Sequence, residues 1–358
     1  MTSACCFAKM CIKEEKDRRR FLGKRTRRTG RESMKDKLLK RDRGEKLAPN
    51  WFDRNKKTLA LLSMVAPAAI WLLLLRYLPI GGIVLAFKNY KIFPRDPTFW
   101  NNLMHSKWVG LKNFEFIFKT DQALVAIRNT LLYNIIFIIL GAIIPVAFAI
   151  MMNEFTKKFV AKAYQTMMFF PYFLSWVVVS YFLNAFIDAQ YGMIPAAQAA
   201  AGKEVISWYT NTKPWPAIII FANLWKNVGY STVLYLAAIT GIDANQYEAA
   251  AIDGASKWQQ IRYVTLPHLR TMISILLILN VGKIFAADFG LFYNVPMQNG
   301  ALFSVTQVID TYIYRVFITT GNISQSSAAG LLQNVIGFVC IMLANAVVKK
   351  IDAESSLF

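Results

Sequence analysis

The apolar residues of the chain gather into six long stretches, and each is about as long as a helix that crosses a lipid bilayer. Crossing the hydrocarbon core of a bilayer takes about 20 consecutive apolar residues. The stretches lack the apolar–polar alternation of barrel strands, so the pattern predicts helices. The predicted spans are residues 58–87, 129–153, 163–187, 215–242, 271 to about 293, and 328–348.

The composition is that of a membrane protein. Hydrophobic residues make up 55% of the chain and charged residues only 17%, whereas soluble domains are about 45–50% apolar and about 25% charged. We therefore predict an all-α, polytopic membrane protein with six transmembrane helices. The cysteines have neither the spacing of a zinc site nor that of a disulfide framework, and we expect free thiols. They are Cys5, Cys6, Cys11 and Cys340.

Positive charge is concentrated before the first predicted span. Residues 1–57 contain 20 Lys and Arg against 8 Asp and Glu, a net charge of +12. Such an arm can bind nucleic acid, but it contains no nucleic-acid motif and a hydrophobic span follows at once. We interpret it as a cytoplasmic anchor under the positive-inside rule. The external segment 88–128 opposes this topology, because it is also basic.

The predicted topology divides the chain into three parts. Residues 1–57 form a basic cytoplasmic arm, residues 58–350 a transmembrane domain, and residues 351–358 a cytoplasmic tail. Six spans place both termini on the same side of the membrane, which we predict to be the cytoplasmic side. Met34 offers a second start, which would make residues 1–33 an extension of the arm.

The segment 243–267 connects the fourth and fifth spans and has a pattern of its own. Asp243 is a good N-cap, and Gln246 follows it at the spacing of a capping box. Gly254 permits a bend, and a second helix must end before Pro267. The segment therefore predicts two short helices with apolar residues that do not suit a free cytosolic loop. It could dock into another protein or lie on the membrane surface, and the pattern alone leaves both open.

Three short motifs occur in a fixed order in this segment. They are Glu248-Ala249-Ala250, Asp253-Gly254-Ala255 and Leu266-Pro267. Between two predicted spans and at this spacing, they resemble the EAA loop of binding-protein-dependent ABC importer permeases. The resemblance implies that 243–267 is a cytoplasmic coupling loop seated in a groove of an ATPase subunit. Glu248 would meet a basic group there, and Gly254 would allow the turn between the two helices.

The resemblance extends from about residue 51 to residue 358. Further sequences similar to the maltose-type carbohydrate group, particularly its polysaccharide or aldouronate branch, lie at 77–82, 86–90, 108–114, 175–178, 225–226 and 310–315. It implies the type I ABC importer permease fold in the bacterial cytoplasmic membrane. The implied activity is import of a sugar or oligosaccharide, with an acidic uronate oligosaccharide as the more specific hypothesis.

The resemblance also implies an assembly. A second related permease would complete the translocation path, two ATPase subunits would bind the coupling loops, and an extracytoplasmic solute-binding protein would deliver the saccharide. ATP and Mg²⁺ would be used by the ATPase, so this chain would bind no cofactor and no metal. Two features depart from the family pattern. The arm before about residue 50 has no recognised counterpart, and Ala287-Asp288-Phe289 stands where Gly-Phe-Glu is expected.

Charges inside the spans suggest a substrate path, because charged side chains in a membrane usually face a wet cavity or a partner. Asn280, Lys283 and Asp288 could share one face of a helix. Alternatives are a Lys283–Asp288 or Lys226–Asp288 pair that locks helices together, snorkelling of Lys226, and interfacial positions for the aromatic residues. The substrate-path candidates are Trp225, Lys226, Tyr230, Asn280, Lys283 and Asp288.

Catalysis by this chain is not expected. The sequence contains only two His and has no Gly-rich phosphate loop with Lys-Ser/Thr and no paired carboxylates. The ATPase activity therefore belongs to a separate partner subunit. The alternative function is that of a stand-alone secondary transporter for a small polar solute. Such transporters often show inverted repeats, which are not visible here, and they have no need of the loop 243–267.

Overall fold

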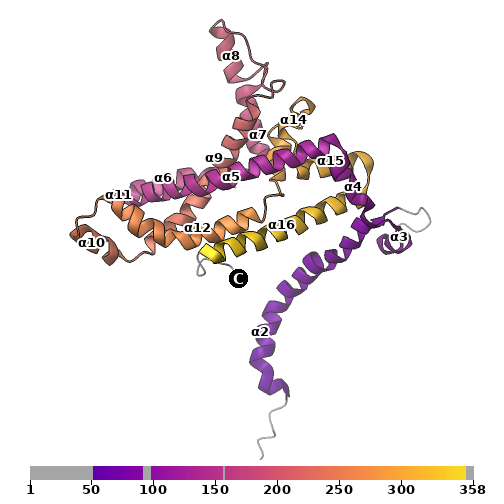
Figure 1. Cartoon of the computed structure of the whole chain (residues 1–358), viewed down its shortest axis with the longest axis horizontal. Helices are drawn as coiled ribbons and strands as arrows, with labels where there is room; N and C mark the ends of the chain where they lie inside the picture. Colours follow the sequence, from indigo (N-terminus) through magenta and orange to yellow (C-terminus); the bar gives the residue numbers. More distant parts are fainter. Residues whose placement is uncertain (1–50, 92–97, 156–157, 352–358) are drawn as a thin grey trace, which may run out of the picture. The chain divides into compact units, whose positions relative to one another are not determined.

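A computed structural model describes residues 51–91, 98–155 and 158–351 (Figure 1). The described residues are mainly helical, and the chain divides into two compact units, residues 1–78 and 79–358. Most of the predicted basic arm and nearly all of the predicted tail lie outside the described residues, as do Met34 and three of the four cysteines.

The first unit contributes one long helix to the described residues. Helix α2 (Trp51–Leu72) begins before the predicted start at residue 58 and continues into a π-helical turn, η1 (Leu73–Tyr77). Pro67 lies inside α2. The run Lys56–Phe87 is 32 residues long and has the hydropathy of a membrane span.

The second unit begins with a small subdomain. The 3₁₀ helix η2 (Leu78–Phe87) leads into β1 (Lys88–Asn89), which pairs antiparallel with β2 (Lys107–Trp108). Lys88 is buried and donates from Nζ to the carbonyl oxygen of Leu103 at 2.7 Å. The remaining elements of the subdomain are α3 (Phe99–His105), η3 (Gly110–Phe114) and α4 (Glu115–Lys119).

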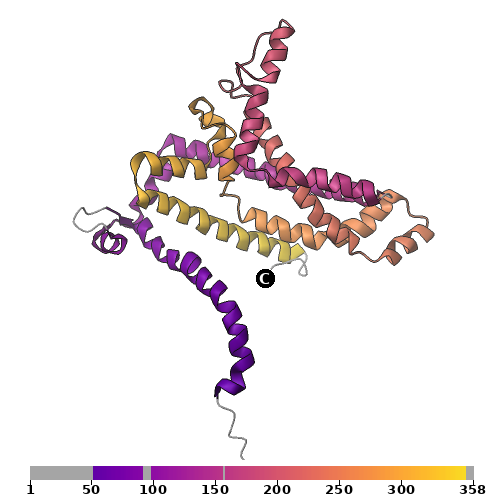
Figure 2. The same cartoon turned by 180° about the vertical axis from the view of Figure 1, so that it is seen from behind.

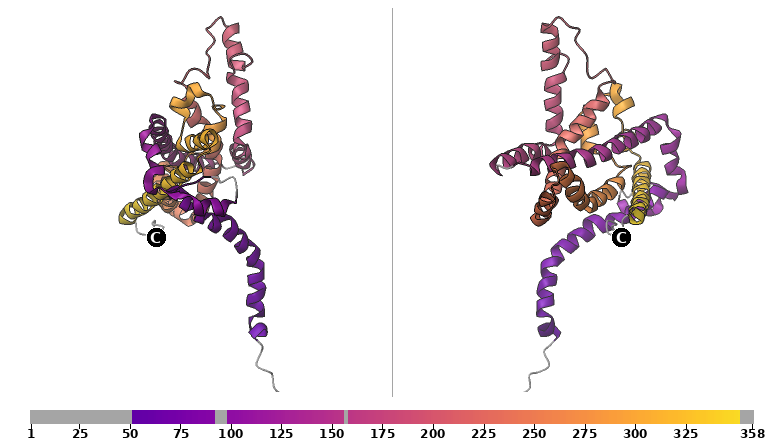
Figure 3. Two further views of the ribbon diagram at one scale, coloured as in Figure 1. Left: turned by 90° about the vertical axis from the view of Figure 1, so that its right-hand side faces the viewer. Right: turned by 60° about the vertical axis from the view of Figure 1, so that its left-hand side comes forward.

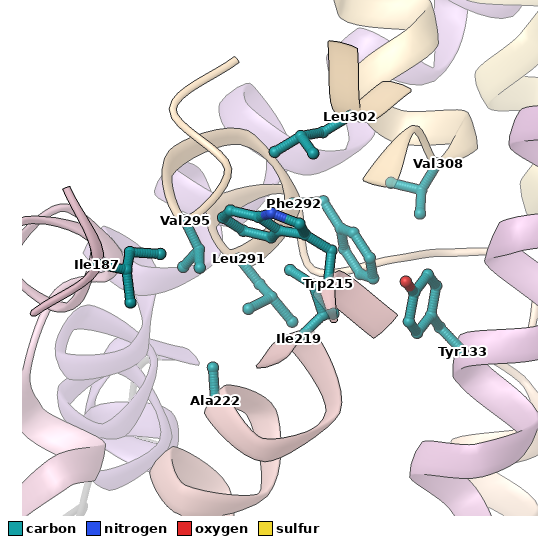
Figure 4. Close-up of a cluster of buried hydrophobic side chains, with 10 residues drawn as sticks. All are labelled: Tyr133, Ile187, Trp215, Ile219, Ala222, Leu291, Phe292, Val295, Leu302 and Val308. Carbon is teal, nitrogen blue, oxygen red and sulfur yellow. The ribbon is translucent and has the colours of Figure 1, made fainter. Parts of the chain in front are cut away.

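Four long helices form the bundle of the second unit (Figure 1): α5 (Asp121–Asn153), α9 (Trp215–Thr240), α12 (Leu266–Val281) and α16 (Ile323–Ile351). Helices α5, α9 and α12 share an apolar cluster around Val146, Tyr235 and Leu269. A second cluster joins the other end of α9 to α5 and α13, where Trp215, Tyr133 and Phe292 converge (Figure 4).

The predicted third span is not one straight helix. It consists of α6 (Lys158–Phe169), the 3₁₀ turn η4 (Phe170–Phe173) and α7 (Trp176–Ile187), and the two halves are bent by 98° at the break. Proline has no N–H to continue the helix, so Pro171 is well placed to initiate the break. Helix α7 then carries α8 (Met193–Ala200) away from the long helices, as the views agree (Figures 1 and 3).

The prediction of a fifth span reaching residue 293 is wrong. Helix α12 ends at Val281, and Asp288 has an extended backbone at the N-cap of the next helix. The elements that follow are α13 (Phe289–Asn294), η6 (Gly300–Leu302), α14 (Phe303–Thr306) and α15 (Ile309–Thr320). Asn280, Lys283 and Asp288 therefore do not lie on one continuous helix.

By length and composition, four described helices can cross a membrane, and a fifth crossing results if the bent pair counts as one span. Helix α9 occupies the predicted fourth span but is not among these helices. Its middle contains Asn223, Lys226 and Asn227, which lower its hydropathy. The predicted helical membrane architecture is confirmed, whereas length and composition alone do not reproduce the count of six.

Candidate functional site

The segment 243–267 folds as two short helices at one end of the second unit, as predicted (Figures 1 and 2). The first is α10 (Ala244–Ile252) and the second is α11 (Lys257–Gln260), which continues through a π-helical turn, η5 (Ile261–Thr265), into α12. The prediction that the second helix ends before Pro267 is wrong, because the helical run continues past the proline, and the turn before it is π-helical rather than a regular α-helix that would need the missing N–H. Asp243 caps α10, and its carboxylate accepts from the Asn245 N–H at 3.0 Å. Gln246 was expected to complete a capping box with its side chain. Instead, its backbone N–H donates to the carbonyl oxygen of Asp243 at 3.1 Å.

Gly254 makes the turn between the two helices. Its φ of +77° lies in the left-handed region that favours glycine. The N–H groups of Gly254 and Ala255 donate to the carbonyls of Ala251 and Ala250 at 3.1 and 2.9 Å, which satisfies the end of α10. A Cβ at this position would meet no atom within 4 Å, so the backbone angle alone explains the glycine.

The second helix begins with a capping box that the sequence analysis missed. The Ser256 hydroxyl accepts from the Gln259 N–H, and the Gln259 side chain accepts from the Ser256 N–H at 2.7 Å. The signal was present as Ser-x-x-Gln, beginning two residues after the glycine. Both helices therefore start at fixed points, and the loop has a defined shape before any partner binds.

Two side-chain contacts fix the loop to the bundle. The hydroxyl groups of Tyr247 and Thr265 lie 2.9 Å apart, which connects α10 to the π-helical turn. Lys257 pairs with Glu154 at 3.1 Å, which connects α11 to the residue after α5. The ion pair is exposed and contributes little stability, about 0–1 kcal/mol. The ion pair shows that the loop contacts the C-terminal end of α5.

The loop exposes a mixture of apolar and acidic side chains. Ile252 is 87% exposed at the end of α10, and Trp258 is 68% exposed on α11. The acidic motif residues Glu248 and Asp253 are also exposed, and no residue of α10 is buried. Among the other motif residues, Ala249 and Pro267 are exposed, and Ala250, Ala255 and Leu266 are half-buried. An exposed apolar end on a preformed turn is suited to docking into another protein.

Lys226, a substrate-path candidate, has several described partners around its charge. It donates from Nζ to the carbonyl oxygens of Tyr172, at 2.9 Å, and Leu174. The ammonium group also lies 5.2 Å from the ring centroid of Trp176. These acceptors belong to the break in the third span, where carbonyls lack helical partners. Lys226 therefore supplies hydrogen bonds to carbonyl groups at the break between α6 and α7.

Asp288 lies beside the same tryptophan. Its Oδ2 accepts from Trp176 Nε1 at 2.7 Å, and its Oδ1 accepts from the Leu291 N–H at 3.3 Å, which caps α13. Trp176 thus lies between the positive charge of Lys226 and the negative charge of Asp288. Tyr230 stacks on Tyr172 at a centroid distance of 4.7 Å and completes an aromatic wall.

The remaining candidates lie elsewhere. Trp225 lies on another face of α9, where it lines an apolar pocket with Phe148 and Met168. Asn280 and Lys283 are exposed at and just beyond the end of α12. The structure therefore brings Lys226, Tyr230 and Asp288 together and leaves the other three apart. Within residues 51–91, 98–155 and 158–351, no group of three His, Cys, Asp or Glu is placed to hold a metal.

Comparison with known proteins places these features in a family. The family model of the binding-protein-dependent transport system inner membrane component matches residues 138–352, which include the whole loop. The chain is 32% identical to Protein LplB of Bacillus subtilis (strain 168), over 85% of this chain and 93% of that protein. It is also 32% identical to the polygalacturonan/rhamnogalacturonan transport system permease protein YteP of the same strain, over 82% and 89% of the two chains.

Solved structures give the same result. One chain in a crystal structure of a bacterial ABC transporter involved in the import of the acidic polysaccharide alginate matches with a TM-score of 0.73 and 30% identity. The match covers 84% of this chain and 99% of that chain. A bacterial alginate ABC transporter in complex with an alginate pentasaccharide-bound periplasmic protein matches with a TM-score of 0.73 and 29% identity.

Proposed function

Since this chain belongs to the family of binding-protein-dependent transport system inner membrane components, we propose that it is one of two permease subunits of an ATP-driven importer for acidic oligosaccharides. Its spans and those of a second, related permease would enclose the translocation path. A solute-binding protein outside the membrane would deliver the saccharide. Two ATPase subunits inside would bind ATP and Mg²⁺ and drive the cycle.

The exposed loop 243–267 is the observation that carries the proposal. An isoleucine that is 87% exposed, next to a rigid turn and two exposed carboxylates, is costly to leave in water. A groove in an ATPase subunit would cover it and would offer a basic group to Glu248. Closure of the ATPase dimer would then move the loops of the two permeases together and switch the spans between two rigid arrangements.

The substrate class rests on the relatives and on charge. One relative is named for transport of polygalacturonan and rhamnogalacturonan, and one solved structure for import of alginate, which favours an acidic saccharide for this chain. The segment 88–128, on the side we assign to the exterior, is basic and would attract a polyanion. Attraction of the substrate would explain why this external segment is basic, although the positive-inside rule predicts the opposite. With the arm at 1–57 and the tail at 351–358 in the cytoplasm, the loop is on the ATPase side.

Co-purification with the ATPase encoded beside the gene tests the proposal. We expect the wild type to retain the ATPase, and Glu248→Lys and Gly254→Asp to lose it while the protein remains folded. Glu204→Lys is the matched control, because Glu204 is an exposed glutamate outside the loop. A wild type that binds no ATPase, or loop variants that bind it fully, would reject the proposal and favour a stand-alone secondary transporter.

A further inference from the structure

Arg315 on α15 has a guanidinium group without a described counter-charge. The group is stacked on the ring of Phe303, 3.5 Å from its centroid, and the side chain is half-buried. Stacking on a ring fixes the plane of the guanidinium but uses none of its five N–H donors. Within the described part of the chain, no oxygen accepts a hydrogen bond from it.

The two acidic residues nearest to Arg315 in the sequence already accept hydrogen bonds from other groups. Asp310 lies on the same helix, but its Oδ2 accepts from the Ala287 N–H at 2.7 Å and from Gln333 at 3.3 Å. Asp288 is bound to Trp176 and caps α13. A partly buried cation is costly without a hydrogen-bonded anion, so the positive charge of Arg315 is available for an anion from outside the chain.

A second unpaired donor lies in the same cavity. Gln307 is 4% exposed, and its Nε2 has no acceptor among the described residues. Gln307 and Arg315 both line a small cavity between α13, α14 and α15, backed by Phe292 of the apolar cluster (Figure 4). The cavity volume, about 10 Å³, is that of one water-sized group. It accommodates an oxygen of a carboxylate but not a sugar ring.

Aromatic side chains next to this cavity offer a surface for the rest of a ligand. Tyr293 lines the cavity and stacks on Phe289 at a centroid distance of 4.8 Å. Tyr314 lies edge-on to both rings, at 5.1 and 5.3 Å. Phe289 and Tyr314 are 37% and 38% exposed, so a ligand can reach them. Flat aromatic faces beside a few well-placed polar groups are typical of sites for small organic ligands.

One wall of the cavity is held by an uncommon backbone. Met297 and Gln298 both have positive φ, 51° and 53°, although neither is glycine. Two adjacent left-handed residues cost free energy, and such costs concentrate at binding sites. The turn brings Gln298 to the lining of the cavity. A polar side chain therefore reaches the cavity from a turn that the rest of the fold must hold in place.

We propose that Arg315 and Gln307 form a subsite for the carboxylate of one uronate unit, whose sugar ring packs against Phe289 and Tyr314. Arginine is the preferred partner for a carboxylate, because its planar fork donates two parallel hydrogen bonds. Helix α15 lies at the end of α5 opposite the loop 243–267 (Figures 1 and 2). The subsite is then on the side from which the substrate enters. The inference rests on the proposed function, because it assumes an acidic saccharide.

Uptake by the complete importer tests the subsite, with trigalacturonate and its methyl ester as probes. The ester has the same sugar rings but no carboxylate charge. We expect Arg315→Gln to raise the KM for the acid about 10- to 100-fold, the effect of losing a charge-assisted hydrogen bond, and to change the KM for the ester less than about twofold. Arg315→Lys keeps the positive charge but loses the two parallel N–H donors. Its KM for the acid should therefore lie between those of Arg315→Gln and the wild type.

Arg270→Gln is the matched control. Arg270 is exposed on α12, outside both the basic segment 88–128 and the loop 243–267, so its loss should affect both probes equally. Equal effects of Arg315→Gln on the two probes, or none on either, would overturn the subsite. Loss of the solute-binding protein or second permease from the Arg315→Gln complex would also overturn it, because the bound carboxylate would then belong to a protein. A wild type that takes up neither trigalacturonate nor a trisaccharide of alginate would refute the proposed function itself; if it takes up only the alginate trisaccharide, that acid and its ester replace the two probes.

Discussion

Trp176 donates a hydrogen bond from Nε1 to Asp288 Oδ2 at 2.7 Å, across 112 positions of sequence. The tryptophan is the first residue of α7, and the aspartate is the N-cap of α13. One carboxylate thus accepts from both helices, since its other oxygen caps Leu291. The contact therefore joins the start of α7, directly after the 98° bend, to the start of α13.

Removing the carboxylate should loosen both helices. We expect Asp288→Ala to destabilise the purified complex by about 1–3 kcal/mol, because it removes a helix cap and leaves an indole N–H without its acceptor. Asp288→Asn keeps an acceptor oxygen and should cost less. Thermal unfolding of the two variants beside the wild type measures the difference, and equal stability of Asp288→Ala and the wild type would contradict the expectation.

Lys226 should act on structure rather than on substrate choice. Lys226→Met removes the donor to the carbonyl oxygens of Tyr172 and Leu174 and leaves both without that partner at the break. We expect lower thermal stability, by about 1–3 kcal/mol, and similar losses of transport for trigalacturonate and its methyl ester. Lys226→Arg should recover part of both. A loss confined to the acidic probe would instead place Lys226 in the substrate path.

Gly229 is required where α9 passes α6. A Cβ at this position would overlap the carbonyl oxygen of Met168, which belongs to the backbone and cannot rotate away. Gly141 in α5 is a matched control, because a Cβ there would meet nothing within 4 Å. We expect Gly229→Ala to destabilise the complex by about 1–3 kcal/mol through overpacking. Gly141→Ala should be neutral or stabilising by up to about 1 kcal/mol. Melting temperatures that rank the two variants in the reverse order would contradict the close approach.

Tyr209, in the segment between α8 and α9, should make the protein sensitive to alkali. Burial, with a smaller effect of Asp188, raises the pKa of its hydroxyl to about 12. The folded state therefore holds the phenol proton more tightly than the unfolded state, whose pKa is about 10. The associated stability is complete below about pH 10 and is lost as the pH rises toward 12.

Tyr209→Phe isolates this contribution. The hydroxyl is buried without a hydrogen-bond partner among the described residues, so its removal should be neutral or stabilising at pH 7. Above about pH 10 the variant should lose less stability than the wild type. Melting temperatures of both proteins from pH 8 to pH 11 provide the comparison. Parallel curves would show that Tyr209 does not contribute to the alkaline loss.

The loop was predictable because its signals are local. Asp243 and Gly254 act on residues within one or two turns, and the structure has two helices divided at Gly254. Pro267 was the misleading signal, because the first turn of a helix tolerates proline and the helical run continues through it. The Ser256–Gln259 capping box has an equally local signal, which the sequence analysis did not use. Local backbone chemistry thus accounts for the shape of the loop, while the protein that it contacts stays a prediction.

The polar cluster was less predictable, because its partners are distant in sequence. Lys226 binds carbonyls 52 and 54 positions away, and no pattern in α9 indicates them. Pro171 is tolerated in many membrane helices, so its presence does not distinguish a gentle kink from a 98° break. Asp288 was expected within a span, but an aspartate before a short apolar run is equally typical of an N-cap. Arg315 could not be predicted as a binding residue, because the sequence does not reveal that Asp310 and Asp288 accept hydrogen bonds from other groups.

The helical run from Lys257 to Val281 is 25 residues long and leads from the loop 243–267 into the bundle, and it contains the π-helical turn Ile261–Thr265 and Pro267. Long helices bend at such places, because the regular hydrogen-bond ladder is interrupted there. The loop and the bundle are therefore joined by helix throughout, with a bending point next to the loop. Under the proposed function, a movement of the loop with its ATPase would change the angle at this point, and α12 would carry the movement toward Val281, after which the chain reaches Asp288.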